Sequence, residues 1–212
     1  MTTSPTPSQL IASLELCAEA RTDLFDERHT SAFRLFNGFV EGYPELAVDL
    51  YGKTALIHHY GAPEQREMVA VAQDWLQARF DWLQTIVVKQ RKGATDAARR
   101  GVVAIGKKPD RKIREHGVWY SADLLMNRDA SFYLDTRNLR RWILDNLSGK
   151  TVLNTFAYTG SLGVAAVAAG ATRVVQSDLN RQFLNVAKTS HTLNGFAIDK
   201  KMFVSADFFP HI

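Results

Sequence analysis

Hydrophobic residues recur at two different spacings along the chain, and each spacing predicts one type of element. Apolar residues three and four positions apart predict amphipathic helices over 10–18 and 68–80. Short apolar runs between Gly, Asn and Pro residues are typical of strands, and we expect the first four runs to be antiparallel. The runs cover residues 33–36, 39–40, 46–51, 54–60, 85–88 and 101–105. The first part of the chain is therefore predicted to be a small α+β module that ends near residue 116.

After residue 117 the predicted strands and helices alternate regularly. Gly170 and Gly195 follow two of these helices, at the position where glycine often ends a helix. Strand–helix–strand connections of this kind give a parallel sheet, so this half is predicted to be doubly wound α/β. The pattern predicts strands at 118–122, 151–155, 173–176 and 202–205 and helices at 139–147, 162–169 and 181–193.

The composition excludes several classes of protein. With 46% hydrophobic residues among 212, the chain can bury a core, and no apolar run approaches the roughly 18 residues of a membrane helix. The single cysteine, Cys17, excludes an intrachain disulfide and a cysteine-based zinc site, and its place on an apolar helix face favours a core role. His58 and His59 are neighbours in a predicted strand and point in opposite directions, which argues against joint metal binding. We expect a cytoplasmic protein without a membrane segment or a metal site.

Charge is distributed unevenly along the chain. Residues 1–88 carry 6 Lys/Arg and 12 Asp/Glu, residues 89–116 carry 10 and 3, and residues 117–212 carry 10 and 7. A basic stretch this dense favours a polyanionic partner such as RNA, and a solvated loop without a partner is the alternative. The candidate RNA-binding residues are Lys89, Arg91, Lys92, Arg99, Arg100, Lys107, Lys108, Arg111, Lys112 and Arg114.

The segment from Asn154 to Gly163 connects a predicted strand to a predicted helix and is the candidate ligand loop. In parallel α/β sheets, ligands bind beyond the carboxyl ends of the strands, and the start of the following helix supplies free N–H groups. Gly160 would let a ligand approach the backbone. A tight turn and close helix packing explain Gly160 and Gly163 equally well.

Two carboxylates follow the next strands. Asp178 could accept hydrogen bonds from both hydroxyls of a ribose, and it could also cap the following helix. Asp207, beside Phe208, could receive the amino group of an adenine or cap a loop. A dinucleotide-binding loop would have glycine where this chain has Tyr158, so a dinucleotide-dependent oxidoreductase is disfavoured. S-adenosylmethionine, a nucleoside cofactor without phosphates, tolerates a bulkier loop.

With these residues the chain resembles the class I S-adenosylmethionine-dependent methyltransferases, and among them the ribosomal RNA large-subunit enzymes related to the cytosine-5 methyltransferases. The resemblance implies a Rossmann-like cofactor domain over 117–212, of which only the first strands are present. A small α+β module over 28–116, which helps to hold RNA, would precede it, with a leader and one helix over 1–27. The matching stretches are 34–38, 42–49, 51–52, 115–120, 132–138 and 154–160, with Asp178 and 194–195.

The resemblance also implies roles for individual residues. The loop 154–161 would hold the methionine part of the cofactor, Asp178 the ribose and Asp207 the adenine. Arg137 would pair with the cofactor carboxylate; a phosphate contact or a salt bridge with Asp135 is the alternative, and Phe132 is alternatively a core residue. The candidate cofactor residues are Phe132, Asp135, Arg137, Asn154, Thr155, Phe156, Tyr158, Thr159, Gly160, Ser161, Asp178, Leu179, Asp207 and Phe208.

The chain departs from the family pattern at two places. Ser131 stands where a glycine is common, and the sequence stops after about three of the seven strands usual for this class, before the substrate-side motif and any downstream cysteine. We therefore expect the N-terminal part of a longer enzyme, inactive by itself, with the catalytic residues and the identity of the methylated atom outside this sequence. The predicted function is methyl transfer to a base of RNA, first of all large-subunit ribosomal RNA. The alternative is an RNA-binding module whose Rossmann half is vestigial.

Overall fold

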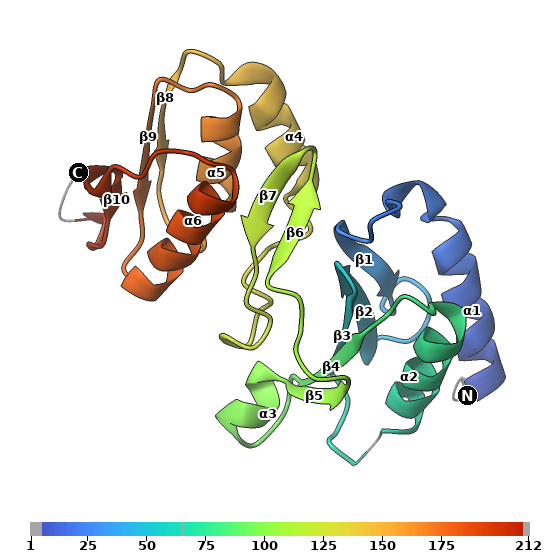
Figure 1. The fold of residues 1–212 in the computed structure, drawn as a ribbon. Coiled ribbons are helices and arrows are strands. Elements are labelled where there is room, and N and C mark those ends of the chain that lie inside the picture. Colours follow the sequence, from blue (N-terminus) through green and yellow to red (C-terminus); the bar gives the residue numbers. More distant parts are fainter. Residues whose placement is uncertain (1–5, 65, 210–212) are drawn as a thin grey trace. The chain divides into compact units, whose positions relative to one another are not determined.

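The computed structural model describes residues 6–64 and 66–209, which form two compact units (Figure 1). The first unit extends to Arg111 and also includes Asp123–Ala130. The second unit contains Lys112–Ala122 and continues from Ser131. A short segment from the middle of the chain therefore belongs to the first unit, although the residues on both sides of it belong to the second. Among the described residues, no helix is long and apolar enough to cross a lipid bilayer.

The first unit is built on a five-stranded sheet with the order β1-β2-β3-β4-β5. Neighbouring strands β1, β2 and β3 are antiparallel, as the sequence predicts. β4 is parallel to β3 because helix α2 (Glu67–Arg79) returns the chain to the same end of the sheet. A short helix α3 (Asp96–Arg100) precedes β5 and is not predicted by the sequence pattern. The strands are β1 (Ala32–Asn37), β2 (Leu46–Tyr51), β3 (Thr54–His59), β4 (Thr85–Gln90) and β5 (Val102–Ile105).

Helices α1 (Pro7–Glu19) and α2 lie on one side of this sheet and enclose the core of the first unit (Figure 1). The start of α1 is fixed by a capping box, in which the Gln9 side chain accepts a hydrogen bond from the Thr6 backbone N–H at 2.8 Å. A 3₁₀ turn follows at Thr22–Leu24. Cys17 is buried in the core cluster, which confirms the core role expected for it.

The strand predicted at 39–40 is wrong. Residues 38–45 form turns, and the side chains of Phe39 and Val40 are 80% and 73% exposed. The backbone closes tightly at Gly38, where an added Cβ would lie 2.0 Å from the carbonyl oxygen of Leu46 and 2.1 Å from that of Tyr43. Two apolar residues in sequence therefore sit at the tip of a turn and not in the sheet.

The second unit begins with a hairpin of β6 (Lys112–Glu115) and β7 (Val118–Ser121). Only β7 is predicted from the sequence. His116 and Gly117 form the two-residue turn with φ of 50° and 83°, the positive values that a tight antiparallel hairpin requires.

A three-stranded parallel sheet with the order β10-β9-β8 follows, which confirms the predicted parallel α/β half. The C-terminal glycines Gly170 and Gly195 have φ of 85° and 69° directly after the caps of α5 and α6, as expected. A 3₁₀ turn at Lys200–Met202 precedes the last strand. The elements are β8 (Thr151–Asn154), α5 (Ser161–Ala168), β9 (Arg173–Ser177), α6 (Arg181–Leu193) and β10 (Phe203–Val204).

Helix α4 (Arg137–Asn146) forms where the pattern predicts a helix, but only part of the predicted apolar face is buried: Ile143 and Leu147 pack in the core of the second unit. Leu139 and Trp142, two of the apolar residues that mark this helix in the sequence, are 44% and 54% exposed. Arg140 is fully buried beside the buried Ile143. A charged side chain thus takes a core position that a hydrophobic pattern cannot indicate.

Candidate functional site

Three residues of the loop between β8 and α5 adopt a left-handed backbone conformation. The φ angle is 51° at Phe156, 51° at Tyr158 and 75° at Gly160. Positive φ is unfavourable for residues with a Cβ, and such residues persist where the surroundings hold them and cluster at binding sites. The loop predicted to bind the ligand is thus held in an unusual conformation at two aromatic positions.

The loop is anchored to the end of β9 by backbone and carboxylate contacts. The Ala157 N–H donates to the Ser177 carbonyl at 2.8 Å, and the Tyr158 N–H donates to Oδ2 of Asp178 at 2.7 Å. Oδ1 of Asp178 accepts the Asn180 N–H at 2.8 Å. Because Asn180 is the N-cap of α6, Asp178 does not have the capping role that was its alternative. Each carboxylate oxygen keeps a second lone pair, so Asp178 can still accept two hydroxyls.

Close packing, as well as backbone conformation, explains the two glycines of this segment. A Cβ at Gly160 would lie 2.4 Å from Oε1 of Gln176, and a Cβ at Gly163 would lie 2.4 Å from Cδ of Gln176. Gln176 is 1% exposed and comes from β9, so its side chain lies directly beneath the loop and the first turn of α5. The packing alternative for both glycines is therefore supported, and Gln176 is a residue that sequence reasoning missed.

Polar groups without partners remain at this end of the sheet. Gly160 is the N-cap residue of α5 and has no side chain, so no side-chain oxygen accepts a hydrogen bond from the first N–H groups of that helix. The buried Nδ2 of Asn154 has no hydrogen-bond partner among the described residues. Free donors beside a carboxylate with spare lone pairs fit a ligand that carries both a carboxylate and ribose hydroxyls.

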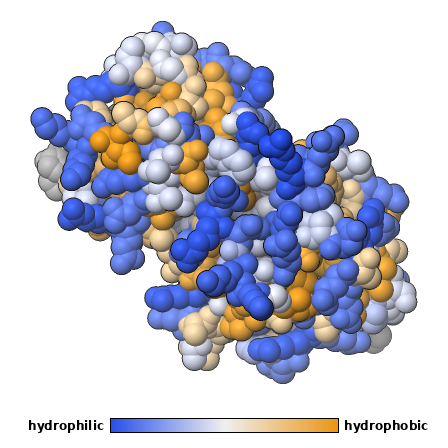
Figure 2. Space-filling view, viewed as in Figure 1, coloured by the Kyte–Doolittle hydropathy of each residue, from blue (hydrophilic) through white to orange (hydrophobic). Residues whose placement is uncertain are grey.

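Exposed apolar side chains gather beyond the ends of the three parallel strands. Phe156 is 64% exposed and Leu179 is 75% exposed, and the ring of Phe156 lies 5.6 Å from that of Phe208. Figure 2 shows apolar patches on the largely hydrophilic surface. Asp207 is exposed and its Oδ1 accepts the Phe209 N–H at 3.2 Å, as in the loop-capping alternative. The exposed apolar side chains, together with the Asp207 carboxylate, suit a flat, partly apolar ligand such as an adenine.

The segment before α4 is held by a buried ion pair that the sequence did not indicate. Glu115 and Arg140 both have fully buried side chains. Nε of Arg140 donates to Oε1 of Glu115 at 2.6 Å, and Nη2 of Arg140 donates to Oε2 at 3.0 Å. Arg140 also donates to the Tyr133 carbonyl at 2.9 Å. Arg137 pairs with the same carboxylate at 3.2 Å, not with Asp135 as the salt-bridge alternative supposed.

Two residues of this segment differ in exposure. Phe132 is 2% exposed and lies under the Arg140 guanidinium at 4.1 Å, in keeping with its core alternative, whereas Asp135 is exposed. Ser131 has φ of 58°, which explains why glycine is common there, and its carbonyl accepts a hydrogen bond from the Thr159 hydroxyl. Thr159 thereby ties the ligand loop to the start of this segment. Thr155 and Ser161, the remaining candidates of the loop, are partly exposed.

The basic stretch is not uniformly exposed. Lys89 is fully buried, and its Nζ donates to the carbonyls of Asn127 at 2.6 Å and Asp129 at 3.0 Å. Burial, reinforced by the charge of Arg91, lowers the pKa of Lys89 to about 8. Lys89 therefore anchors the 123–130 segment to β4 and does not offer its charge to a surface ligand.

The other basic residues reach the surface to different degrees. Arg91 is partly covered and pairs with Asp129 at 3.4 Å, and Arg99 pairs with Asp96. In the second unit the cations of Lys112 and Arg114 lie 4.8 and 5.7 Å from the ring of Trp119. Exposed residues of the stretch are Lys92, Arg100, Lys107, Lys108, Arg111, Lys112 and Arg114.

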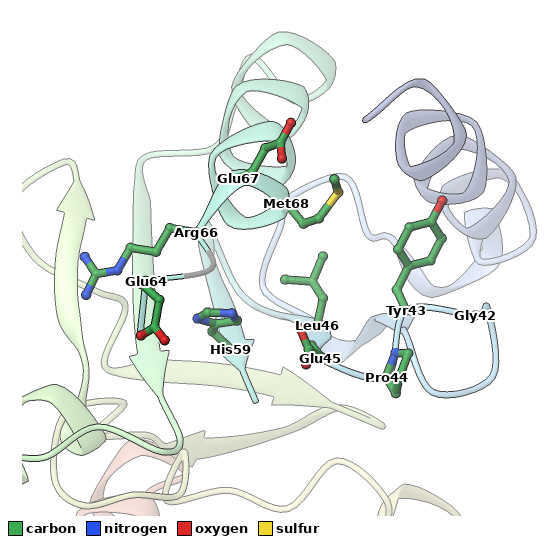
Figure 3. A pocket seen from close by; sticks show the side chains of 10 residues that line it. All are labelled: Gly42, Tyr43, Pro44, Glu45, Leu46, His59, Glu64, Arg66, Glu67 and Met68. Carbon is green, nitrogen blue, oxygen red and sulfur yellow. The ribbon is translucent and has the colours of Figure 1, made fainter. Parts of the chain in front are cut away.

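A cavity of about 590 Å³ opens in the first unit between the end of β3 and the start of α2 (Figure 3). His59 is one of the residues that line the cavity, and its Nδ1 lies 2.6 Å from Oε1 of Gln90. Its rim is of mixed charge, with Glu45, Glu67 and Arg66. Among the described residues, no cluster of His, Cys, Asp and Glu side chains has the arrangement of a metal site.

Comparison with known proteins matches most of both units to one family. The model of a family described as S-adenosylmethionine-dependent methyltransferase matches residues 34–211. The ribosomal RNA large subunit methyltransferase I of Aeromonas salmonicida is 32% identical over 92% of this chain and 50% of its own length. The enzyme of the same name from Vibrio cholerae is 30% identical over 94% of this chain and 51% of its own length.

The fold also has a solved counterpart. A structure described as a methyltransferase complexed with SAH superimposes with a TM-score of 0.85 at 22% identity, covering 100% of this chain and 55% of that one. The chain thus spans about half the length of the curated relatives it matches.

Proposed function

Because the chain belongs to the family of S-adenosylmethionine-dependent methyltransferases, we propose that its second unit binds S-adenosylmethionine and that the enzyme methylates a base of RNA. The observation that carries the proposal is the anchoring of the strained loop 155–160 by Asp178. In this arrangement the carboxylate that would accept the ribose also fixes the loop that would hold the methionine part. When bound, the cofactor supplies a methyl group on a positively charged sulfur.

The residues of this chain bind and orient that cofactor. Asp178 accepts the ribose hydroxyls through its remaining lone pairs, and Asn154 and the N–H groups at the start of α5 donate to the amino-acid part. Phe156, Leu179 and Phe208 supply an apolar surface for the adenine, with Asp207 at its edge. Arg137 already pairs with Glu115, so a contact to the cofactor carboxylate would share the Arg137 guanidinium with that ion pair.

The RNA part of the proposal rests on charge and on relatives. Exposed cations Lys92, Arg100, Lys107, Lys108 and Arg111 lie close together in sequence on the first unit. The relatives named above are ribosomal RNA large subunit methyltransferases, which makes ribosomal RNA the first substrate class to test. An RNA substrate and a single buried cysteine both support a cytoplasmic location for the enzyme.

Calorimetric titration of the chain with S-adenosylhomocysteine tests the cofactor proposal, since this product retains the ribose, adenine and amino acid. A measurable heat of binding is expected. No binding would favour the alternative, an RNA-binding module whose Rossmann half is vestigial.

Charge reversal tests the RNA proposal independently. The double variant Lys107→Glu/Lys108→Glu should bind single-stranded RNA several-fold more weakly, with a shallower dependence on salt and unchanged affinity for S-adenosylhomocysteine. Lys200→Glu/Lys201→Glu is the matched control, because it reverses an exposed lysine pair outside the basic stretch. Equal losses in both variants would mean a general charge effect and would contradict a specific RNA surface.

A further inference from the structure

A buried carboxylate fixes the guanidinium of Arg34 at the surface of the first unit. Asp49 is 2% exposed and accepts from Nε of Arg34 at 2.7 Å and from Nη2 at 3.1 Å. Arg34 on β1 and Asp49 on β2 are register partners, so the pair spans two neighbouring strands. A bidentate pair of this kind leaves the guanidinium one orientation and keeps its remaining N–H groups free of Asp49.

His58 supports this arrangement from β3. Its Nε2 lies 3.0 Å from Oδ2 of Asp49, and its Nδ1 is buried without a partner among the described residues. Burial by itself would raise the pKa of Asp49. Hydrogen bonds from His58 and Arg34 outweigh this effect, so the pKa of Asp49 is lowered. Asp49 therefore stays ionised and keeps Arg34 in place.

A cavity of about 250 Å³ lies beside the fixed guanidinium, lined by Arg34, Asn37, Phe39, Pro44 and Tyr60 among others. Two aromatic rings, a carboxamide and a guanidinium line this cavity, and no acidic side chain is among the described residues that line it. The ring of Tyr60 lies 6.3 Å from that of His58, and the Arg91 guanidinium lies 5.7 Å from it. The volume is below the roughly 300–1,000 Å³ of pockets for drug-sized ligands, so it suits one small planar group.

Phe39 is the residue that most needs an explanation. Its side chain is 80% exposed, but the turn that carries it is held by backbone hydrogen bonds. The Gly38 N–H donates to the Leu46 carbonyl at 3.0 Å, and the Val40 N–H donates to the Asn37 carbonyl at 2.8 Å. Phe39 also lines the cavity, so an exposed aromatic ring is held beside it on a hydrogen-bonded turn, as in surfaces that stack unpaired bases.

We propose that this cavity binds one unpaired nucleobase of RNA, with Phe39 and Tyr60 contacting its face and Asn37 and Arg34 its edge. The inference rests on the proposed RNA substrate and adds a second contact beyond the basic stretch. A base is favoured over a phosphate because Asp49 already balances the charge of Arg34. Asn37 offers a donor and an acceptor and Arg34 offers further donors, which together match the polar edge of a base.

The test compares binding of a fluorescein-labelled single-stranded RNA 12-mer to the chain and to single variants. Phe39→Ala and Tyr60→Ala should each weaken binding about 5- to 150-fold, the range for loss of one stacked base. Val40→Ala is the matched control, because Val40 is 73% exposed on the same turn but does not line the cavity. A 12-bp duplex RNA, whose bases are already stacked, should bind equally to all of these proteins.

The outcomes separate this site from the proposed function. If the chain binds the single strand and Phe39→Ala and Tyr60→Ala behave like Val40→Ala, the nucleobase site is overturned while the basic surface stands. Equal losses for single-stranded and duplex RNA would also overturn it, because they would indicate a change unrelated to an unpaired base. If the unsubstituted chain binds no RNA, the proposed RNA substrate fails and this site fails with it. Circular dichroism of each variant shows whether the fold is retained.

Discussion

The carboxylate of Asp178 accepts the backbone N–H of Tyr158 at 2.7 Å, across the ends of two neighbouring strands. Tyr158 has a φ of 51°, so a residue with a costly backbone conformation is held by a side chain from another strand. The contact links the shape of the ligand loop to the residue proposed to hold the ribose. Changes at Asp178 should therefore affect both loop order and cofactor affinity.

Asp178→Asn tests this link. The amide can still accept one hydrogen bond but cannot accept at both positions as the carboxylate does, so affinity for S-adenosylhomocysteine should fall by about 1–3 kcal/mol. Calorimetry measures the loss. Asp199→Asn is the control, since Asp199 makes a similar local bond, accepting the Lys201 N–H at 2.9 Å, and lies outside the proposed site. If Asp178→Asn bound S-adenosylhomocysteine as tightly as the unsubstituted chain, Asp178 would have a purely structural role.

Gly163→Ala should destabilise the second unit through its contact with Gln176. The added Cβ would lie 2.4 Å from Cδ of Gln176, so we expect a loss of about 1–3 kcal/mol of unfolding free energy in urea denaturation. The double variant Gly163→Ala/Gln176→Ala removes the clashing carboxamide. Gly163→Ala should therefore cost less stability in the Gln176→Ala background than in the unsubstituted chain. If the losses of the two single variants simply added in the double variant, the packing explanation would be contradicted.

The buried pair Glu115–Arg140 should behave as one unit. Arg140→Leu leaves the fully buried Glu115 carboxylate with Arg137 as its remaining arginine partner and should cost about 3 kcal/mol of stability, the lower end of the range for a broken buried pair. The double variant Glu115→Leu/Arg140→Leu removes both charges and should recover part of that loss. Chemical denaturation measures each value. If the double variant were destabilised by the sum of both single variants, the two residues would not be coupled.

Lys89 should make stability depend on pH in the alkaline range. Its pKa is about 8 in the folded chain and 10.5 when unperturbed, so between these values the unfolded chain holds a proton that the folded chain has released. The free energy of unfolding should therefore rise with pH across this window, by up to about 3 kcal/mol from this group.

The measurement compares the unsubstituted chain with Lys89→Met by urea denaturation at pH 7, 8, 9 and 10. The difference in stability between the two should grow with pH in favour of the lysine. Lys92→Met is the control, because Lys92 is an exposed lysine three positions along the chain from Lys89. Parallel pH profiles for the unsubstituted chain and Lys89→Met would show that Lys89 does not titrate in this window.

Local sequence signals determined much of the fold. The strands of the five-stranded and three-stranded sheets, the helices α5 and α6 and the glycines at 170 and 195 follow from spacing and backbone preferences, which act between near neighbours. The segment 154–161 lies between a strand and a helix of the parallel sheet, as the sequence predicts, and its role as a ligand loop stays a prediction.

Only the tertiary structure decided which side chains are buried where the pattern is ambiguous. Lys89 lies in a basic stretch, but it is on the face of β4 covered by the carbonyls of Asn127 and Asp129, residues far away in sequence. Arg140 is buried because Glu115 from another element neutralises it, which leaves Trp142 in solvent. Burial depends on which distant segments meet, and hydrophobic periodicity carries no information about a charged group that finds its partner only after folding.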